Sequence, residues 1–148
     1  MSERVKFQFP DSDLSLVHPS TWIHKCSDGK THVFTNTNVG AFRITPTVVP
    51  KEEFDLKQFL KRNLKASEEK GQSPQMKTYN GNLFIHTRQT LTYDKGTATA
   101  LFYVSACANI AFTCSYVFDD KIIHDEFWKL MHETSLKDLD LILGSIKA

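Results

Sequence analysis

The chain has 148 residues, of which 41% are hydrophobic and 24% charged, and its formal net charge is +1. This length and composition predict one globular domain over residues 1–148, large enough to fold without disulfides or structural metals. The small net charge argues against nucleic acid and anionic membrane surfaces as partners, because both select strongly basic proteins.

The start of the chain and its cysteines predict a location. Residues 1–7 lack the apolar core of a signal peptide, and no later stretch approaches the ~20 apolar residues of a membrane span. Cys26, Cys107 and Cys114 form an odd set without CxxC spacing, which is typical of free thiols in a reducing compartment. We therefore expect a cytoplasmic protein in which Cys107 and Cys114 are buried small hydrophobic residues.

Short strands are predicted throughout the first third of the chain. Alternating apolar residues, bounded by prolines and turn residues, mark extended segments at 5–9, 14–18, 22–26, 32–35 and 41–45. Between the third and fourth segments, Asp28-Gly29 is a strong turn signal and predicts a hairpin.

A helix is predicted from Leu56 to about Lys70. Asp55 is a suitable N-cap, with Gln58 three residues later as in a capping box, and Phe54 and Phe59 have the spacing of a hydrophobic staple. Apolar residues recur at helical spacing inside the segment. Gly71 is expected to end the helix.

The segment from Gln75 to Phe118 is predicted to form an antiparallel meander. Asn80-Gly81 favours a tight hairpin turn, and the most apolar stretch, Thr97 to Phe118, contains a second hairpin that turns near Ala108-Asn109. This turn would place Tyr103 opposite Cys114 and Leu101 opposite Tyr116. Both faces of this hairpin carry apolar side chains, so we expect a central hairpin that is covered on both sides.

Two helical segments are predicted at the C-terminus, around residues 122–131 and 136–146. Thr134 or Ser135 could cap the second, with Asp138 in its first turn. Clustered strands followed by helices indicate an α+β protein with a largely antiparallel sheet. The predicted fold is a three-layer α/β/α sandwich, with the Leu56 helix on one face of the sheet and the 136–146 helix on the other.

Several short patterns, spread over nearly the whole chain, resemble the Mog/PsbP-like fold superfamily. They are Pro19-x-x-Trp22, Gly40-Ala41-Phe42-Arg43-Ile44-Thr45 followed by Phe54 and Phe59-Leu60, Asn80-Gly81, Tyr103-Val104 with Asn109-Ile110-Ala111, and Ile142-Leu143-x-Ser145-Ile146. The chain is similar within this fold to bacterial families of unknown function of about 150 residues. The resemblance implies a binding role more than catalysis, by analogy of fold alone.

No motif in the sequence predicts a catalytic residue, a cofactor or a metal site. His24-x-Cys26 could place two metal ligands on one strand face, with His18, His32, His86, His124 or His132 as further ligands, but zinc sites usually contain tighter ligand pairs. Cys26 with His24 or His32 could form a nucleophile and base, although no oxyanion-hole pattern accompanies them. Partly exposed strand residues are the favoured interpretation of both.

Two functions from different classes remain open on the sequence. The first is a protein-binding role as an adaptor or immunity-type protein, monomeric or homodimeric. Its candidate surface residues are Lys57, Lys61, Arg62, Lys65 and Trp128. The alternative is an enzyme without local motifs, or a small-ligand-binding domain, that uses a cleft beside the central hairpin. The candidate polar groups of this cleft are His86, Arg88 and Tyr103.

Overall fold

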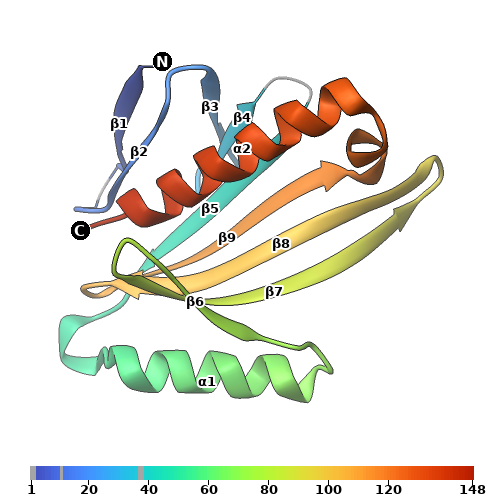
Figure 1. Cartoon of the computed structure of the whole chain (residues 1–148). Coiled ribbons are helices and arrows are strands. Elements are labelled where there is room, and N and C mark those ends of the chain that lie inside the picture. Colours follow the sequence, from blue (N-terminus) through green and yellow to red (C-terminus); the bar gives the residue numbers. More distant parts are fainter. Residues whose placement is uncertain (1–2, 11, 37–38) are drawn as a thin grey trace.

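The computed structural model describes residues 3–10, 12–36 and 39–148. The strands are β1 (Arg4–Gln8), β2 (Ser15–Pro19), β3 (Trp22–Ser27), β4 (Thr31–Asn36), β5 (Gly40–Val48), β6 (Gln75–Tyr79), β7 (Asn82–Tyr93), β8 (Gly96–Cys107) and β9 (Ile110–Asp119). The α-helices of these residues are α1 (Leu56–Glu69) and α2 (Glu126–Ser145). The short 3-10 helices η1 (Lys51–Glu53) and η2 (Asp120–His124) precede them (Figure 1).

Seven of the strands form one antiparallel sheet in the order β3-β4-β5-β9-β8-β7-β6, while β1 and β2 pair separately as a hairpin. The chain leaves the middle of the sheet at the end of β5, and η1 and α1 carry it across one face to the edge strand β6 (Figure 1). The strands β6 to β9 then return to the middle, where β9 pairs with β5. The predicted meander over Gln75 to Phe118 is therefore confirmed.

The predicted hairpin register is also confirmed. Tyr103 pairs with Cys114 and Leu101 with Tyr116, and the turn between β8 and β9 consists of Ala108 and Asn109. Ala108 has a φ of 51°, in the left-handed region that this tight turn requires. Asn80 and Gly81 likewise have positive φ values, of 48° and 85°, in the turn between β6 and β7.

The first helix begins where its cap predicts. The Asp55 carboxylate accepts a hydrogen bond from the backbone N–H of Gln58 at 3.2 Å, and the Phe54 and Phe59 ring centroids lie 5.8 Å apart. After Lys70 the chain turns through Gly71, whose φ is 78°. Its N–H donates to the carbonyl of Glu68 at 3.0 Å, which satisfies a free carbonyl at the helix end.

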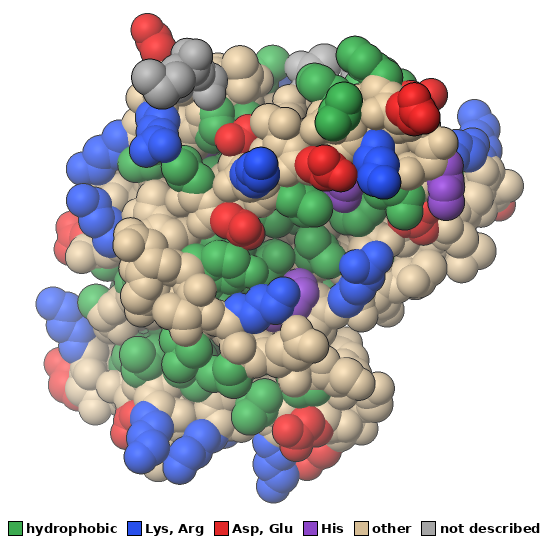
Figure 2. All heavy atoms as spheres, in the orientation of Figure 1, with side chains coloured by type: hydrophobic (Ala, Val, Ile, Leu, Met, Phe, Trp, Pro, Cys, Tyr) green, Lys and Arg blue, Asp and Glu red, His purple; other side chains and the backbone are tan. Residues whose placement is uncertain are grey.

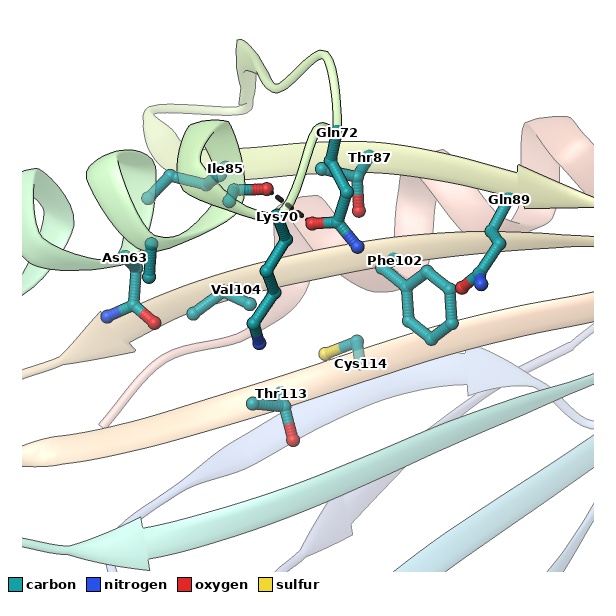
Figure 3. Close-up of a pocket in the computed structure, with 12 residues that line it drawn as sticks. Asn63, Lys70, Gln72, Ile85, Thr87, Gln89, Phe102, Val104, Thr113 and Cys114 are labelled. Atoms are coloured by element: carbon teal, nitrogen blue, oxygen red, sulfur yellow. Dashed lines mark hydrogen bonds between the residues drawn. The ribbon is translucent and has the colours of Figure 1, made fainter.

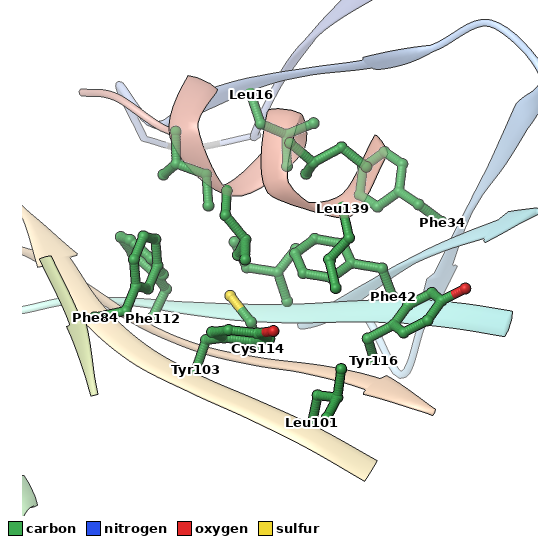
Figure 4. Close-up of a cluster of buried hydrophobic side chains, with 14 of the residues drawn as sticks. Leu16, Phe34, Phe42, Phe84, Leu101, Tyr103, Phe112, Cys114, Tyr116 and Leu139 are labelled. Atoms are coloured by element: carbon green, nitrogen blue, oxygen red, sulfur yellow. The ribbon is translucent and has the colours of Figure 1, made fainter. Parts of the chain in front are cut away.

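The main core lies between α2 and one face of the sheet, which we call the packed face. Alternate residues of the central strands point toward α2, among them Phe42, Tyr103 and Tyr116, and they meet Leu139 from the helix (Figure 4). The β1-β2 hairpin covers the rest of this face, with Leu14 and Leu16 fully buried. The C-terminus joins this cover, because the backbone N–H and C=O of Ser15 both bond Lys147.

The predicted three-layer α/β/α sandwich is wrong. The structure is mostly strand, a seven-stranded sheet with an added hairpin, and helices do not layer both of its faces. On the second face, which we call the open face, α1 contacts β7 and β8 and buries little beyond Leu60 and Ser67. A sheet of seven strands is about 29 Å wide, whereas one helix is ~10 Å across, so α1 leaves most of the open face uncovered.

The predicted break between two C-terminal helices is also wrong, because α2 is continuous from Glu126 to Ser145. Its N-cap is Asp125, whose carboxylate accepts from the N–H groups of Phe127 and Trp128. Ser135 lies in mid-helix, fully buried, and its hydroxyl accepts a 2.6 Å hydrogen bond from the Asn36 side chain. The Ser135 hydroxyl, which the sequence suggested as a helix cap, is thus engaged in a tertiary hydrogen bond to β4.

Candidate functional site

A groove runs along the open face of the sheet beside α1. It consists of three adjoining hollows of about 250, 330 and 360 Å³, all of which are lined by Thr113 of β9. Asn63 and Val104 line two of them, and Thr45 and Phe102 also line two. We call the hollows together the α1 groove; Figure 3 shows the one nearest the end of α1.

The floor of the α1 groove comes from residues that alternate with the core residues along the central strands. Phe102 and Val104 of β8 are half-buried, while Thr113 of β9 is exposed. Because successive side chains of a strand point to opposite faces, these residues are the open-face neighbours of Tyr103 and Cys114. The floor therefore joins an apolar strip to a row of hydroxyl groups.

One wall of the groove is α1, with Asn63 and Ser67 from the helix and Lys70 from its C-cap at helical spacing. The Ser67 hydroxyl donates to the Gln72 side-chain oxygen at 2.6 Å, which holds the segment after the helix against the wall (Figure 3). Asn63 donates to the Phe59 carbonyl at 2.8 Å. Lys70 stretches from the helix end toward β9, with its ammonium group above Thr113 and Cys114 (Figure 3).

The charges that line the α1 groove are of one sign. Lys70 lines the hollow at the end of α1, and Arg43 of β5 lines the hollow farther across the sheet. Among the described residues, no Asp, Glu or His side chain lines any of the three hollows. Figure 2 shows hydrophobic side chains between α1 and the sheet, with both basic and acidic side chains on the outside of the helix. The groove can therefore receive a ligand that is partly apolar and negatively charged.

The structure places the predicted cleft residues on the packed face. The rings of His86 and Tyr103 stack with centroids 4.5 Å apart, both are buried, and His86 Nδ1 lies 2.9 Å from the Phe102 carbonyl oxygen. Burial lowers the pKa of His86 and raises that of Tyr103. Arg88 follows two residues later on β7 and is exposed. These groups lie across the sheet from the α1 groove.

The predicted surface residues lie on two sides of the molecule. Lys57, Lys61, Arg62 and Lys65 are all exposed on α1, on the open-face side. Trp128 is half-buried at the start of α2, where its ring makes an edge contact with Phe127 at 5.3 Å. The sheet separates the two helices, so the structure does not bring these residues together into one surface (Figure 1).

Two of the candidate metal ligands do meet. His24 Nε2 and His32 Nδ1 lie 2.9 Å apart, under the rings of Phe7 and Phe9 from the β1-β2 hairpin region. Cys26 pairs with His32 in the strand register but is exposed. Within residues 3–10, 12–36 and 39–148, no group of three His, Cys, Asp or Glu side chains is placed to hold a metal ion.

The pair of His24 and His32 predicts that the folded protein loses stability in acid. Burial lowers the pKa of His24, and the neighbouring His32 and His18 lower it further; burial also lowers the pKa of His32. The unfolded chain, with histidine pKa values of about 6.5, therefore takes up protons first as the pH falls. This contribution to stability is complete above about pH 6.5 and is lost as the pH drops through the lower pKa values of the folded state.

The measurement is urea unfolding at about pH 7.5 and about pH 5.5. The loss of stability on acidification should be smaller in His24→Gln than in the wild type. His124→Gln, a change at an exposed histidine in η2, should show the wild-type loss. Equal losses in His24→Gln and the wild type would contradict the prediction, because the other buried histidines contribute to both.

Sequence reasoning missed the residues that line the α1 groove. The polar alternation of Thr87 and Gln89 along β7 was a signal that this strand face is not fully buried. No local sequence pattern indicates which face of the sheet stays open, because that depends on where the β1-β2 hairpin and the two helices dock.

Comparisons with known proteins support the fold. No family model matches the chain, and no curated protein matches it. A crystal structure from Bacteroides thetaiotaomicron VPI-5482 is similar, with a TM-score of 0.71 and 20% identity over 100% of this chain and 49% of that one. The solution structure of cyanobacterial PsbP (CyanoP) from Synechocystis sp. PCC 6803 is also similar, with a TM-score of 0.56 and 10% identity over 93% of this chain and 92% of that one. The fold is PsbP-like.

The chain spans about half the length of the Bacteroides chain and nearly all of CyanoP. The predicted resemblance is thus confirmed as a PsbP-like fold, while no family model supports the predicted bacterial families of unknown function. In the part of the chain that the structure describes, neither α-helix is long and apolar enough to cross a membrane.

Proposed function

We propose that this protein is a non-enzymatic binding protein whose α1 groove receives an extended acidic segment of a partner protein. The observation that supports this most directly is the lining of the groove, which combines Arg43 and Lys70 with hydroxyl, amide and apolar side chains. Carboxylates would repel an acidic segment, and the described residues place none in that lining.

An extended segment suits the arrangement of the groove. The three hollows adjoin at Thr113, so an occupant can lie across the open face from α1 over β8 and β9 toward β5. Its alternate side chains could reach the apolar strip at Phe102 and Val104, while its backbone meets the hydroxyl groups of Thr45 and Thr113. An adaptor or immunity-type role in the bacterial cytoplasm stays a prediction from the sequence.

The test uses a labelled ten-residue peptide that alternates glutamate with valine and threonine, and a matched peptide with lysine in place of glutamate. The acidic peptide should bind and shift the NMR signals of Phe102, Val104 and Thr113, whereas the basic peptide should not. Lys70→Glu should weaken binding about tenfold, since it replaces an attraction by a repulsion at the groove.

Lys65→Glu is the matched control, because it makes the same charge change on the same helix at an exposed residue outside the groove lining. It should leave the affinity within about twofold of the wild type. Equal weakening by both variants would move the site to the outer side of α1 and contradict the groove. Failure of the acidic peptide to bind at all would contradict the proposal as a whole.

A second candidate function is the binding of a small anionic molecule. It is favoured by the hollow at the end of α1, whose ~250 Å³ approach the lower limit of about 300 Å³ for small-ligand sites and which contains Lys70, Gln72 and Asn63. A panel of small carboxylates and phosphate esters should then raise the melting temperature of the wild type but not of Lys70→Glu. Shifts that are equal in the two proteins would contradict this candidate.

A further inference from the structure

The outward side of α2 carries an apolar patch. Phe127 and Leu130 are 64% and 66% exposed, and Met131 is 39% exposed. These residues recur at the spacing of one helix face, over the first turns of α2, and we call them the α2 patch. Figure 2 shows hydrophobic side chains over this part of α2, among scattered acidic and basic groups. Large exposed apolar side chains that cluster on one face indicate an interaction surface.

The charges beside the α2 patch follow a pattern that indicates the partner. One flank of the helix carries Glu126, Lys129, Glu133 and Lys137 in this order, all exposed. When a second α2 is laid antiparallel, with Met131 near the two-fold axis, Glu126 of one copy lies beside Lys137 of the other. Lys129 then lies beside Glu133, and symmetry repeats both pairs. In a parallel pairing the two-fold axis would run along the helices and bring opposite flanks together, so these charge pairs would not form.

We propose that the occupant of the α2 patch is a second copy of this chain, bound through an antiparallel pairing of the two α2 helices. A two-fold axis perpendicular to the helices makes the interface isologous, so the same flank serves both copies with opposite charges in contact. The two Leu130 side chains pack near the axis, and Phe127 of each copy packs on Thr134 and the Lys137 stem of the other. The α2 patch lies across the sheet from the α1 groove, so this dimer is independent of the proposed function.

The expected dimer is weak. One pair of helices that meet over a few turns buries less than the ~1,200 Å² of a standard interface. Sedimentation velocity from about 5 to about 500 µM should therefore show a reversible shift from monomer to dimer. Leu130→Glu should keep the protein monomeric over this range. Ile23→Ser, which removes an apolar side chain that is 55% exposed on β3, should leave the dimer unchanged.

A charge exchange tests the antiparallel orientation. Lys129→Glu places two glutamates together at each symmetric contact and should weaken the dimer by about threefold to tenfold. The double variant Lys129→Glu/Glu133→Lys restores opposite charges in the antiparallel pairing and should recover most of that loss.

A wild-type protein that stays monomeric at the highest concentration overturns the inference. So does a dimer that is insensitive to Leu130→Glu, or a double variant no stronger than Lys129→Glu. A monomer that binds phosphatidylcholine vesicles, and loses this binding in Leu130→Glu, would assign the α2 patch to a lipid surface and overturn the dimer as well.

Discussion

Replacing Phe112 by alanine should lower the free energy of unfolding by about 3–5 kcal/mol, the cost of deleting a fully buried aromatic side chain. Phe112 is 1% exposed in the central strand β9, and its ring lies 6.0 Å from that of Phe84 on the packed face. Neighbouring strands and α2 pack around Phe112 from several sides. The structure therefore cannot collapse fully into the cavity that Phe112→Ala would leave.

Urea denaturation followed by circular dichroism measures this loss, with an unchanged m-value as the sign that only stability has changed. Phe127→Ala is the matched control, because it makes the same substitution at a ring that is 64% exposed, and it should cost no more than about 0.5 kcal/mol in the monomer. A loss below about 1 kcal/mol in Phe112→Ala would show that Phe112 is not a core residue.

Gly40→Ala should destabilise the protein by about 1–3 kcal/mol, although alanine is ordinarily the better residue in a strand. A Cβ atom at Gly40 would lie 2.5 Å from Cζ of Tyr116 and also overlap its hydroxyl group. Tyr116 is fully buried between Trp22 and Phe118, so its ring cannot swing aside. The Tyr116 ring occupies the space that a side chain at this position would need, so the position requires a glycine.

A double-mutant cycle separates this clash from other effects of the added methyl group. Tyr116→Leu will itself be costly, but adding Gly40→Ala to it should cost less than about 0.5 kcal/mol, because the overlapping ring atoms are gone. The same cost for Gly40→Ala in both backgrounds would contradict the steric explanation.

The local structure of the chain was predictable because its signals are local. The Asp55 cap, the Asn80-Gly81 turn and the turn at Ala108-Asn109 depend on backbone conformations and hydrogen bonds within a few residues. The hairpin register followed from its turn, since a known turn fixes the pairing of the residues on either side.

The predictions failed where a side chain that could serve a local role instead contacts a segment far away in the sequence. Ser135 had the chemistry of a helix cap, but its hydroxyl bonds Asn36 of β4, and α2 continues through it. Similarly, the apolar side chains on both faces of β8 predicted two helical covers. In the structure the β1-β2 hairpin shares one cover with α2, and α1 alone lies on the other side, over β7 and β8.

The sequence by itself therefore determined the strands of this protein, its first helix, the turns of its hairpins and the pairing of the central hairpin, but not the single C-terminal helix. The spacing of hydrophobic residues, the helix caps and the turn residues each act within about one element, so the sequence alone reveals them. Only the tertiary structure decided which face of the sheet stays open. The α1 groove exists because η1 and α1 cross a wide sheet at one side, and that route depends on the docking of segments far apart in sequence.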